Sequence, residues 1–221
     1  MKLNKSTFSE QVYQLLREDI LTQRIPLGEK LTLKTLKERF EVSSTPIREA
    51  LTRLSQDGLV DYYSNVGMNV INIQKNDLIE LFQFMGDLDG LAISYAKNYP
   101  HQEEILARLR HVLSITREIQ NQGMPEDRIS EWIENSDQFH LIFYDFCQNN
   151  RLKTAAEKLR SQLTIFSNIY ETQLDKQIEI SRMHEQIFDA YCNKEYNLAA
   201  RLMKKHLETS LQYALEAYEN L

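Results

Sequence analysis

Helix-breaking residues are confined to the first part of this sequence. The chain has only 6 glycines and 4 prolines in 221 residues, and neither type occurs after Pro125. Because glycine and proline most often end or kink a helix, residues 126–221 are expected to form long helices. In the first 70 residues both types recur at short intervals, so short elements are expected there.

Apolar residues recur at helical spacing from residue 77 to the end, for example Leu78, Leu81, Phe82 and Met85. The pattern predicts a six-helix antiparallel bundle over residues 78–221, preceded by a linker at 74–77. The six helices are expected at about 77–98, 102–121, 126–148, 151–173, 176–192 and 195–219.

The first 73 residues carry a different pattern. It predicts a first helix from Phe8 to Ile20, a second at 33–40, and a third with Thr45 as N-cap and Pro46 at its first position. Two strands at 59–63 and 69–73 follow and form a hairpin. This order is that of a winged helix-turn-helix, whose third helix offers a polar face to the DNA major groove. The fold class is therefore mainly α.

Net charge is unevenly divided between the two parts. Residues 1–75 hold 11 Lys+Arg and 9 Asp+Glu, a net of +2, and the remainder holds 15 and 23, a net of −8. A basic module joined to an acidic one is compatible with local phosphate binding. No apolar run is long enough for a membrane span, and the first 16 residues lack the apolar segment expected of a secretory signal. Cys147 and Cys192 have no metal or disulfide spacing. A cytoplasmic protein is expected.

The N-terminal part resembles the DNA-binding domain of GntR-family regulators. The resemblance lies in PLGEKL at 26–31, VSSTPIREALTRL at 42–54 and DGLV at 57–60. It implies that the operator is contacted by Lys34, Ser44, Thr45, Arg48 and the wing residue Gly67. The family usually has arginine where this chain has Ser44, which puts the family's usual operator core in doubt.

Three histidines lie on three different predicted helices: His140, His184 and His206. Imidazole is the commonest side-chain metal ligand, and facing helices of a bundle can bring such ligands together. The alternative is structural: His140 and His184 as core residues bonded to carbonyl groups, and His206 as a solvated residue of the last helix.

Residues 77–221 resemble the FCD sensor domain of the FadR subfamily, in its VanR-like group. The matching pieces are LDGLA at 88–92, DQFH at 137–140, HEQI at 184–187 and His206-Leu207. The resemblance implies a divalent metal, zinc or nickel, held by three histidines and one aspartate beside a pocket for a small organic acid. Ser136 replaces the usual aspartate, so Asp137 is the candidate fourth ligand. Met85 replaces a usual arginine, and the candidate effector-binding residues are Asp89 and Arg182, with Arg160 as a further substitute.

These observations predict a homodimeric transcription regulator, by the resemblance a repressor, that binds a pseudo-palindromic operator under the control of a small-molecule effector. A constitutive DNA-binding regulator whose helical domain only dimerises is one alternative. A metal-dependent hydrolytic enzyme is the other, although HExxH and nucleophile-elbow motifs are lacking.

Overall fold

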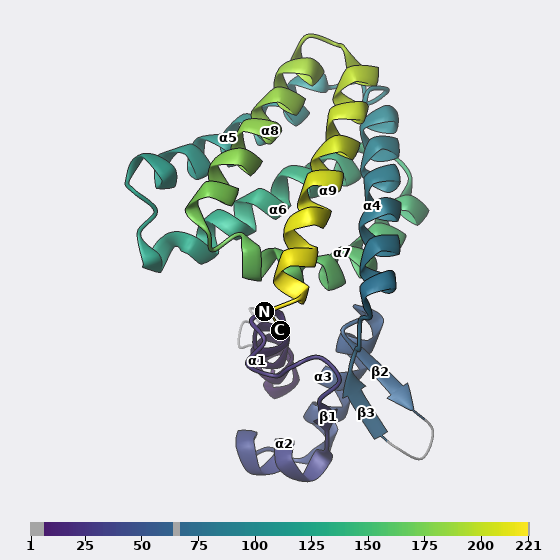
Figure 1. Cartoon of the computed structure of the whole chain (residues 1–221). Helices are drawn as coiled ribbons and strands as arrows, with labels where there is room; N and C mark the ends of the chain where they lie inside the picture. Colours follow the sequence, from purple (N-terminus) through teal and green to yellow (C-terminus); the bar gives the residue numbers. More distant parts are fainter. Residues whose placement is uncertain (1–6, 64–66, 221) are drawn as a thin grey trace. The chain divides into compact units, whose positions relative to one another are not determined.

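The computed structural model describes residues 7–63 and 67–220 (Figure 1). Residues up to Gln74 form one compact unit and residues from Lys75 form a second, and each is described by itself. They are called the N-terminal and C-terminal units below.

The described residues of the N-terminal unit form three helices and a small sheet. Its elements are α1 (Phe8–Leu21), β1 (Lys30–Leu31), α2 (Leu33–Phe40), α3 (Ser44–Gln56), β2 (Val60–Tyr63) and β3 (Gly67–Val70). The sheet order is β1-β3-β2 with antiparallel pairing. Fully buried Leu16, Ile20, Ile47 and Leu54 form the centre of the core between α1 and α3. This is the predicted winged helix-turn-helix.

Three details of this unit differ from the sequence-based prediction. Helix α3 begins at Ser44 with Ser43 as N-cap, so Thr45 is not the cap, and Pro46 still lies in the first turn, where backbone N–H groups need no helical acceptor. Strand β3 begins at Gly67, earlier than predicted, because it pairs with β2 over its whole length, from Gly67 opposite Tyr63. Strand β1 was missed, since two residues are too few to show alternation. The hairpin tip, residues 64–66, lies outside the described residues.

A buried carboxylate joins α1 to α2. Asp19 is 5% exposed, and it accepts hydrogen bonds from Arg39 on α2 and from Arg24, whose Nε lies 2.7 Å from Asp19 Oδ1. Burying a carboxylate is costly unless cations and hydrogen bonds compensate, so this cluster fixes α2 relative to α1.

The C-terminal unit is a helical bundle. Its helices are α4 (Lys75–Ala96), α5 (Gln102–Asn121), η1 (Glu126–Arg128), α6 (Ile129–Phe146), α7 (Asn150–Tyr170), α8 (Leu174–Cys192) and α9 (Tyr196–Tyr218). Helix α9 packs against both α4 and α8 (Figure 1). Trp132, Phe139, Phe143 and Phe166 are buried in the core. The six predicted helices are therefore found within a few residues of their expected bounds, and the first turn of α4 lies within the predicted linker.

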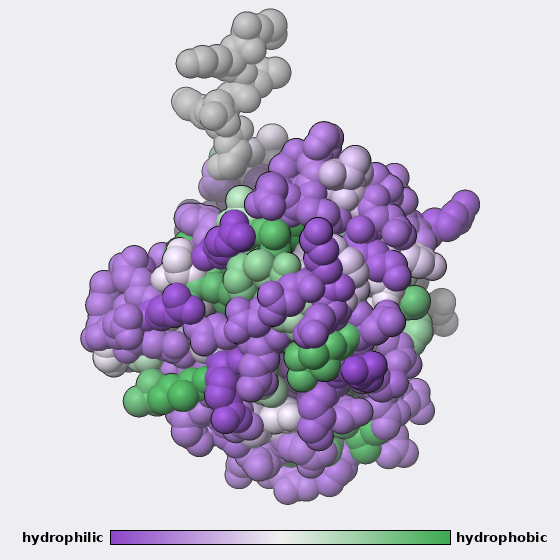
Figure 2. All heavy atoms as spheres, turned by 90° about the horizontal axis from the view of Figure 1, so that it is seen from above, coloured by the Kyte–Doolittle hydropathy of each residue, from purple (hydrophilic) through white to green (hydrophobic). Residues whose placement is uncertain are grey.

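Among the described helices, none is both long enough and apolar enough to cross a bilayer. On the face drawn in Figure 2, the side chains are mostly hydrophilic and the hydrophobic ones form small separate groups.

Candidate metal centre and DNA-recognition helix

Three histidine side chains meet inside the C-terminal unit. His140 comes from α6, His184 from α8 and His206 from α9, and each is at least 95% buried. Their Nε2 atoms form a nearly equilateral triangle, with separations of 3.2 Å for His184–His140, 3.2 Å for His184–His206 and 3.3 Å for His206–His140. The bundle thus brings together all three predicted histidines.

The orientation of His140 is set by a buried carboxylate on α4. Asp89 Oδ2 lies 2.8 Å from His140 Nδ1, and Asp89 Oδ1 accepts a hydrogen bond of 2.6 Å from the Tyr144 hydroxyl. Burial raises the pKa of Asp89, and the Arg160 guanidinium and the Tyr144 hydroxyl oppose this rise. Since donors surround it, the carboxylate accepts the Nδ1 proton of His140, which leaves the Nε2 lone pair facing the other two rings.

Burial also keeps the three rings neutral. It lowers the pKa of His140 and His184 well below 6.5 and that of His206 to about 4. Neutral imidazole is the form that binds metal ions.

The geometry fits a tetrahedrally coordinated ion. Around such an ion with metal–nitrogen bonds of about 2.0 Å, two ligand nitrogens lie about 3.3 Å apart, close to the separations between the three Nε2 atoms. Three ligands leave one position open, as in sites that bind a further molecule. The arrangement can therefore hold a divalent metal such as zinc.

The predicted fourth ligand, Asp137, has another partner. Its Oδ1 lies 2.6 Å from Arg160 Nε, and its carboxylate is outside the group of ligand atoms that the three histidines form. Ser136, which precedes His140 by one turn, is buried and lines a small cavity beside the histidines. The structure therefore brings the three histidines together, whereas the Asp137 carboxylate pairs with Arg160.

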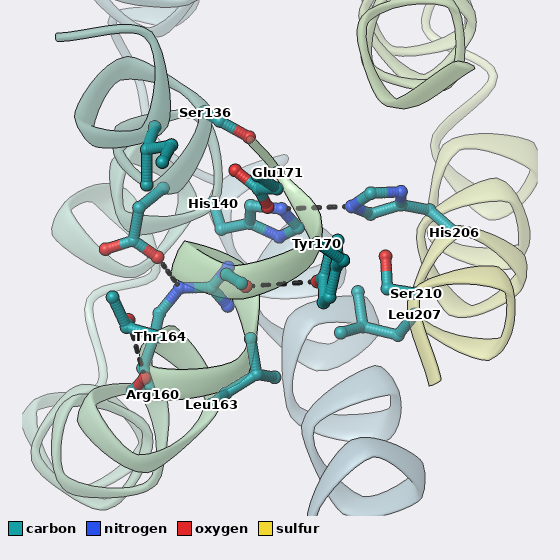
Figure 3. A pocket seen from close by; sticks show the side chains of 13 residues that line it. Ser136, His140, Arg160, Leu163, Thr164, Tyr170, Glu171, His206, Leu207 and Ser210 are labelled. Carbon is teal, nitrogen blue, oxygen red and sulfur yellow. Dashed lines mark hydrogen bonds and ion pairs between the residues drawn. The ribbon is translucent and has the colours of Figure 1, made fainter. Parts of the chain in front are cut away.

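A small cavity adjoins the histidines. Its volume is about 20 Å³, and Figure 3 shows His140, His206, Arg160 and Glu171 around it. A cavity of this size holds about one water molecule. The remaining lining residues are Ile133, Ser136, Asp137, Leu163, Thr164, Ser167, Tyr170, Leu207 and Ser210.

Of the two arginines considered for an effector, only Arg160 lines this cavity. It is 4% exposed. Its Nη1 lies 3.3 Å from Asp89 Oδ2, and its Nε donates a hydrogen bond to Asp137. The side chain of Arg182 is 68% exposed, and its ion-pair partner is Glu179 at 4.0 Å. Asp89 contacts Nδ1 of His140 and is not among the cavity-lining residues.

Glu171 is a lining residue that sequence reasoning missed. It follows the last residue of α7 and is 6% exposed. Burial and the nearby Asp137 carboxylate raise the pKa of Glu171 to about 8, against opposing effects of Arg160, Ser136 and Ser167. An isolated glutamate at a helix end looks like a solvated residue in the sequence, so no pattern signalled its burial.

This raised pKa gives a testable pH dependence in the metal-free protein. Glu171 is protonated in the folded state and ionised in the unfolded state between pH 4.5 and about 8. Its stabilising contribution is therefore fully present below pH 4.5 and is lost as the pH rises through about 8, by up to about 1.4 kcal/mol per pH unit. Urea unfolding followed by the fluorescence of Trp132 should show this slope in wild type and not in Glu171→Gln. Parallel pH curves for the two proteins would contradict it.

In the N-terminal unit, most of the predicted DNA-binding residues lie at the surface. Thr45 and Arg48 on α3 and Lys34 on α2 are exposed, and Ser44 is half-buried at the start of α3. In the described part of the chain, neither Arg48 nor Lys34 forms an ion pair. Gly67 opens β3, next to the hairpin tip. This surface can approach a DNA backbone and base edges.

Arg53, also on α3, is held against α1. Its guanidinium bonds to Glu10 and lies 3.9 Å from the centre of the Tyr13 ring. Tyr13 in turn donates a hydrogen bond of 2.6 Å to Asp57. Arg53 therefore stabilises the contact between α1 and α3.

Comparison with known proteins agrees with both halves of this description. Residues 8–70 match the family described as bacterial regulatory proteins, gntR family, and residues 80–209 match the FCD domain. The chain belongs to the GntR family and carries an FCD domain. The FadR subfamily and its VanR-like group are consistent with that domain. The protein is a transcriptional regulator and not an enzyme, which removes the hydrolytic alternative.

Relatives match this GntR regulator over nearly its whole length. YdhC of Bacillus subtilis, an uncharacterized HTH-type transcriptional regulator, is 27% identical over 220 residues that cover 99% of this chain and 96% of that protein. The HTH-type transcriptional repressor GlaR of Escherichia coli is 23% identical over 212 residues, covering 93% and 94%. The structure of E. coli McbR/YncC superposes with a TM-score of 0.76 at 20% identity, covering 97% and 100% of the two chains.

Proposed function

We propose that this GntR regulator is a repressor whose operator binding is controlled by a small effector bound beside a divalent metal. The convergence of three buried Nε2 atoms within 3.3 Å of one another carries the proposal. Relatives named as repressors, such as GlaR, support the sign of regulation.

The metal, zinc or nickel, is held by His140, His184 and His206. When bound, it supplies a positive charge and an open coordination position for an anionic oxygen of a ligand. Asp89 orients His140 through Nδ1, and Tyr144 and Arg160 hold Asp89 in place. Asp137 stays a candidate for the fourth ligand only if it leaves Arg160.

The effector requires a change in the cavity. A volume of about 20 Å³ accommodates one water and no organic acid, so the walls must separate when an effector binds. Such a ligand can shift the regulator between two states only if it binds them with different affinity. An effector that fits only the open cavity binds the open state more tightly than the closed state.

A dimer presents two α3 helices to a two-fold symmetric operator. On α4, the large apolar side chains Phe84, Leu91 and Tyr95 are 52%, 43% and 40% exposed. Their spacing of seven and four residues places them on one side of the helix. This stripe supports dimerisation through the C-terminal unit.

Arg48→Ala is expected to weaken operator binding by about ten- to a hundredfold, because a bidentate arginine–guanine contact contributes about 1–3 kcal/mol. The operator is first selected in vitro from random DNA, and affinity is measured by fluorescence anisotropy at one fixed salt concentration. Arg182→Ala, an exposed arginine of the C-terminal unit, is the control and should bind as wild type does. Equal affinity of Arg48→Ala and wild type would show that Arg48 takes no part in operator recognition.

Native mass spectrometry of the purified chain tests the sensing part. We expect a dimer with about one divalent metal per chain. We also expect a co-purified or added ligand to dissociate the operator complex. A metal-free dimer that binds the operator regardless of ligand would establish the constitutive alternative.

A further inference from the structure

Among the described residues that line the cavity beside the histidines, none offers a free positive charge. Arg160 is the guanidinium that lines it, and it already faces two carboxylates. Its Nε lies 2.6 Å from Asp137 Oδ1, and its Nη1 lies 3.4 Å and 3.3 Å from the two oxygens of Asp89. A second anionic group of an effector therefore finds no unpaired cation here.

The same cavity holds a carboxyl oxygen that lacks a partner. Among the described residues, nothing donates a hydrogen bond to Glu171 Oε2, although the residue is 6% exposed. Hydrogen bonds fix the backbone position of this residue, since the Glu171 N–H bonds to Ser167 O at 2.8 Å and the Glu171 carbonyl accepts from Gln177. A buried carboxyl oxygen without a donor costs free energy, which a ligand donor can recover.

We propose that Glu171 selects the effector by accepting a hydrogen bond from its amino group. The effector is then a small amino acid, with its carboxylate at the metal and its ammonium group between Glu171 and Asp137. This inference rests on the proposed metal-dependent sensor. A bound ammonium group favours the ionised form of Glu171, and Asp137 adds a second carboxylate on this side of the cavity. An ammonium group is therefore favoured over a hydroxyl or a second carboxylate, since Arg160 is already shared.

Three probes built on the same three-carbon acid separate these possibilities. Propionate has one carboxylate, β-alanine adds an ammonium group at the far carbon, and succinate adds a carboxylate at that position. Binding to the zinc-loaded full-length protein is measured by isothermal titration calorimetry and by the shift in Tm. We expect β-alanine to bind about tenfold more tightly than propionate and succinate to bind most weakly.

Glu171→Gln should remove the preference for β-alanine over propionate while zinc content stays at the wild-type level. Glu157→Gln, which changes an exposed glutamate on α7, is the matched control and should keep the wild-type ranking. The proposal would be overturned if propionate or succinate bound as tightly as β-alanine, or if the ranking were unchanged in Glu171→Gln. It would also be overturned if β-alanine did not bind zinc-loaded protein at millimolar concentration. Zinc content is measured in the same samples, so a wild-type protein that holds no metal identifies a failure of the sensor itself.

Discussion

His184→Ala is expected to abolish the stabilisation of this regulator by zinc. Ligand at a hundredfold excess over its Kd adds about 2.7 kcal/mol to the free energy of unfolding. For a chain of this size that corresponds to a rise in Tm of about 5–10 °C in the metal-free wild type on adding zinc. The Nε2 atom of His184 lies 3.2 Å from the Nε2 atom of each of the other two histidines, so its removal leaves two ligands and an incomplete site.

The readout is the zinc-induced change in Tm, because the variant also loses buried contacts and its metal-free Tm is lower for that reason. His111→Ala, an exposed histidine on α5, is the matched control and should respond to zinc as wild type does. Titration with nickel tests the second metal in the same way. A wild-type protein that neither zinc nor nickel stabilises would show that the three rings form a metal-free hydrogen-bonded core.

Arg160→Met is expected to destabilise the C-terminal unit by about 3 kcal/mol. Removing one member of a buried ion pair typically costs about 3–5 kcal/mol, because the remaining charge is left uncompensated. The lower end applies here, since Asp89 is 1% exposed but the side chain of Asp137 is 28% exposed and remains partly solvated. Trp132 is the single tryptophan of the chain and is buried in α6, so its fluorescence reports unfolding of this unit.

Adding Asp89→Asn to Arg160→Met should recover part of the loss, because the buried charge is then gone. Arg182→Met removes an exposed arginine and should change the free energy of unfolding by less than about 0.5 kcal/mol. A loss below about 1 kcal/mol in Arg160→Met would mean that water reaches Asp89 and replaces the guanidinium.

Local pattern was sufficient to predict the long helices and the hairpin of this chain. The absence of glycine and proline after Pro125 predicted the long C-terminal helices, and the Thr45-Pro46 pair marked the start of α3 to within a residue or two. Two-residue β1 could not be predicted, because it exists only through its pairing with β3. Helix bounds depend on local propensity and capping, whereas such a strand depends on a neighbour distant in sequence.

In the candidate site, too, some features were predicted from the sequence and others were not. The sequence alone determined that this chain has a winged helix-turn-helix followed by a helical sensor, and it singled out His140, His184 and His206 by their positions on separate helices. Only the tertiary structure placed Asp137 on Arg160, left Arg182 at the surface and buried Glu171. These outcomes depend on which side chains of different helices meet and how far water is excluded, and neither quantity is encoded in the spacing along one helix.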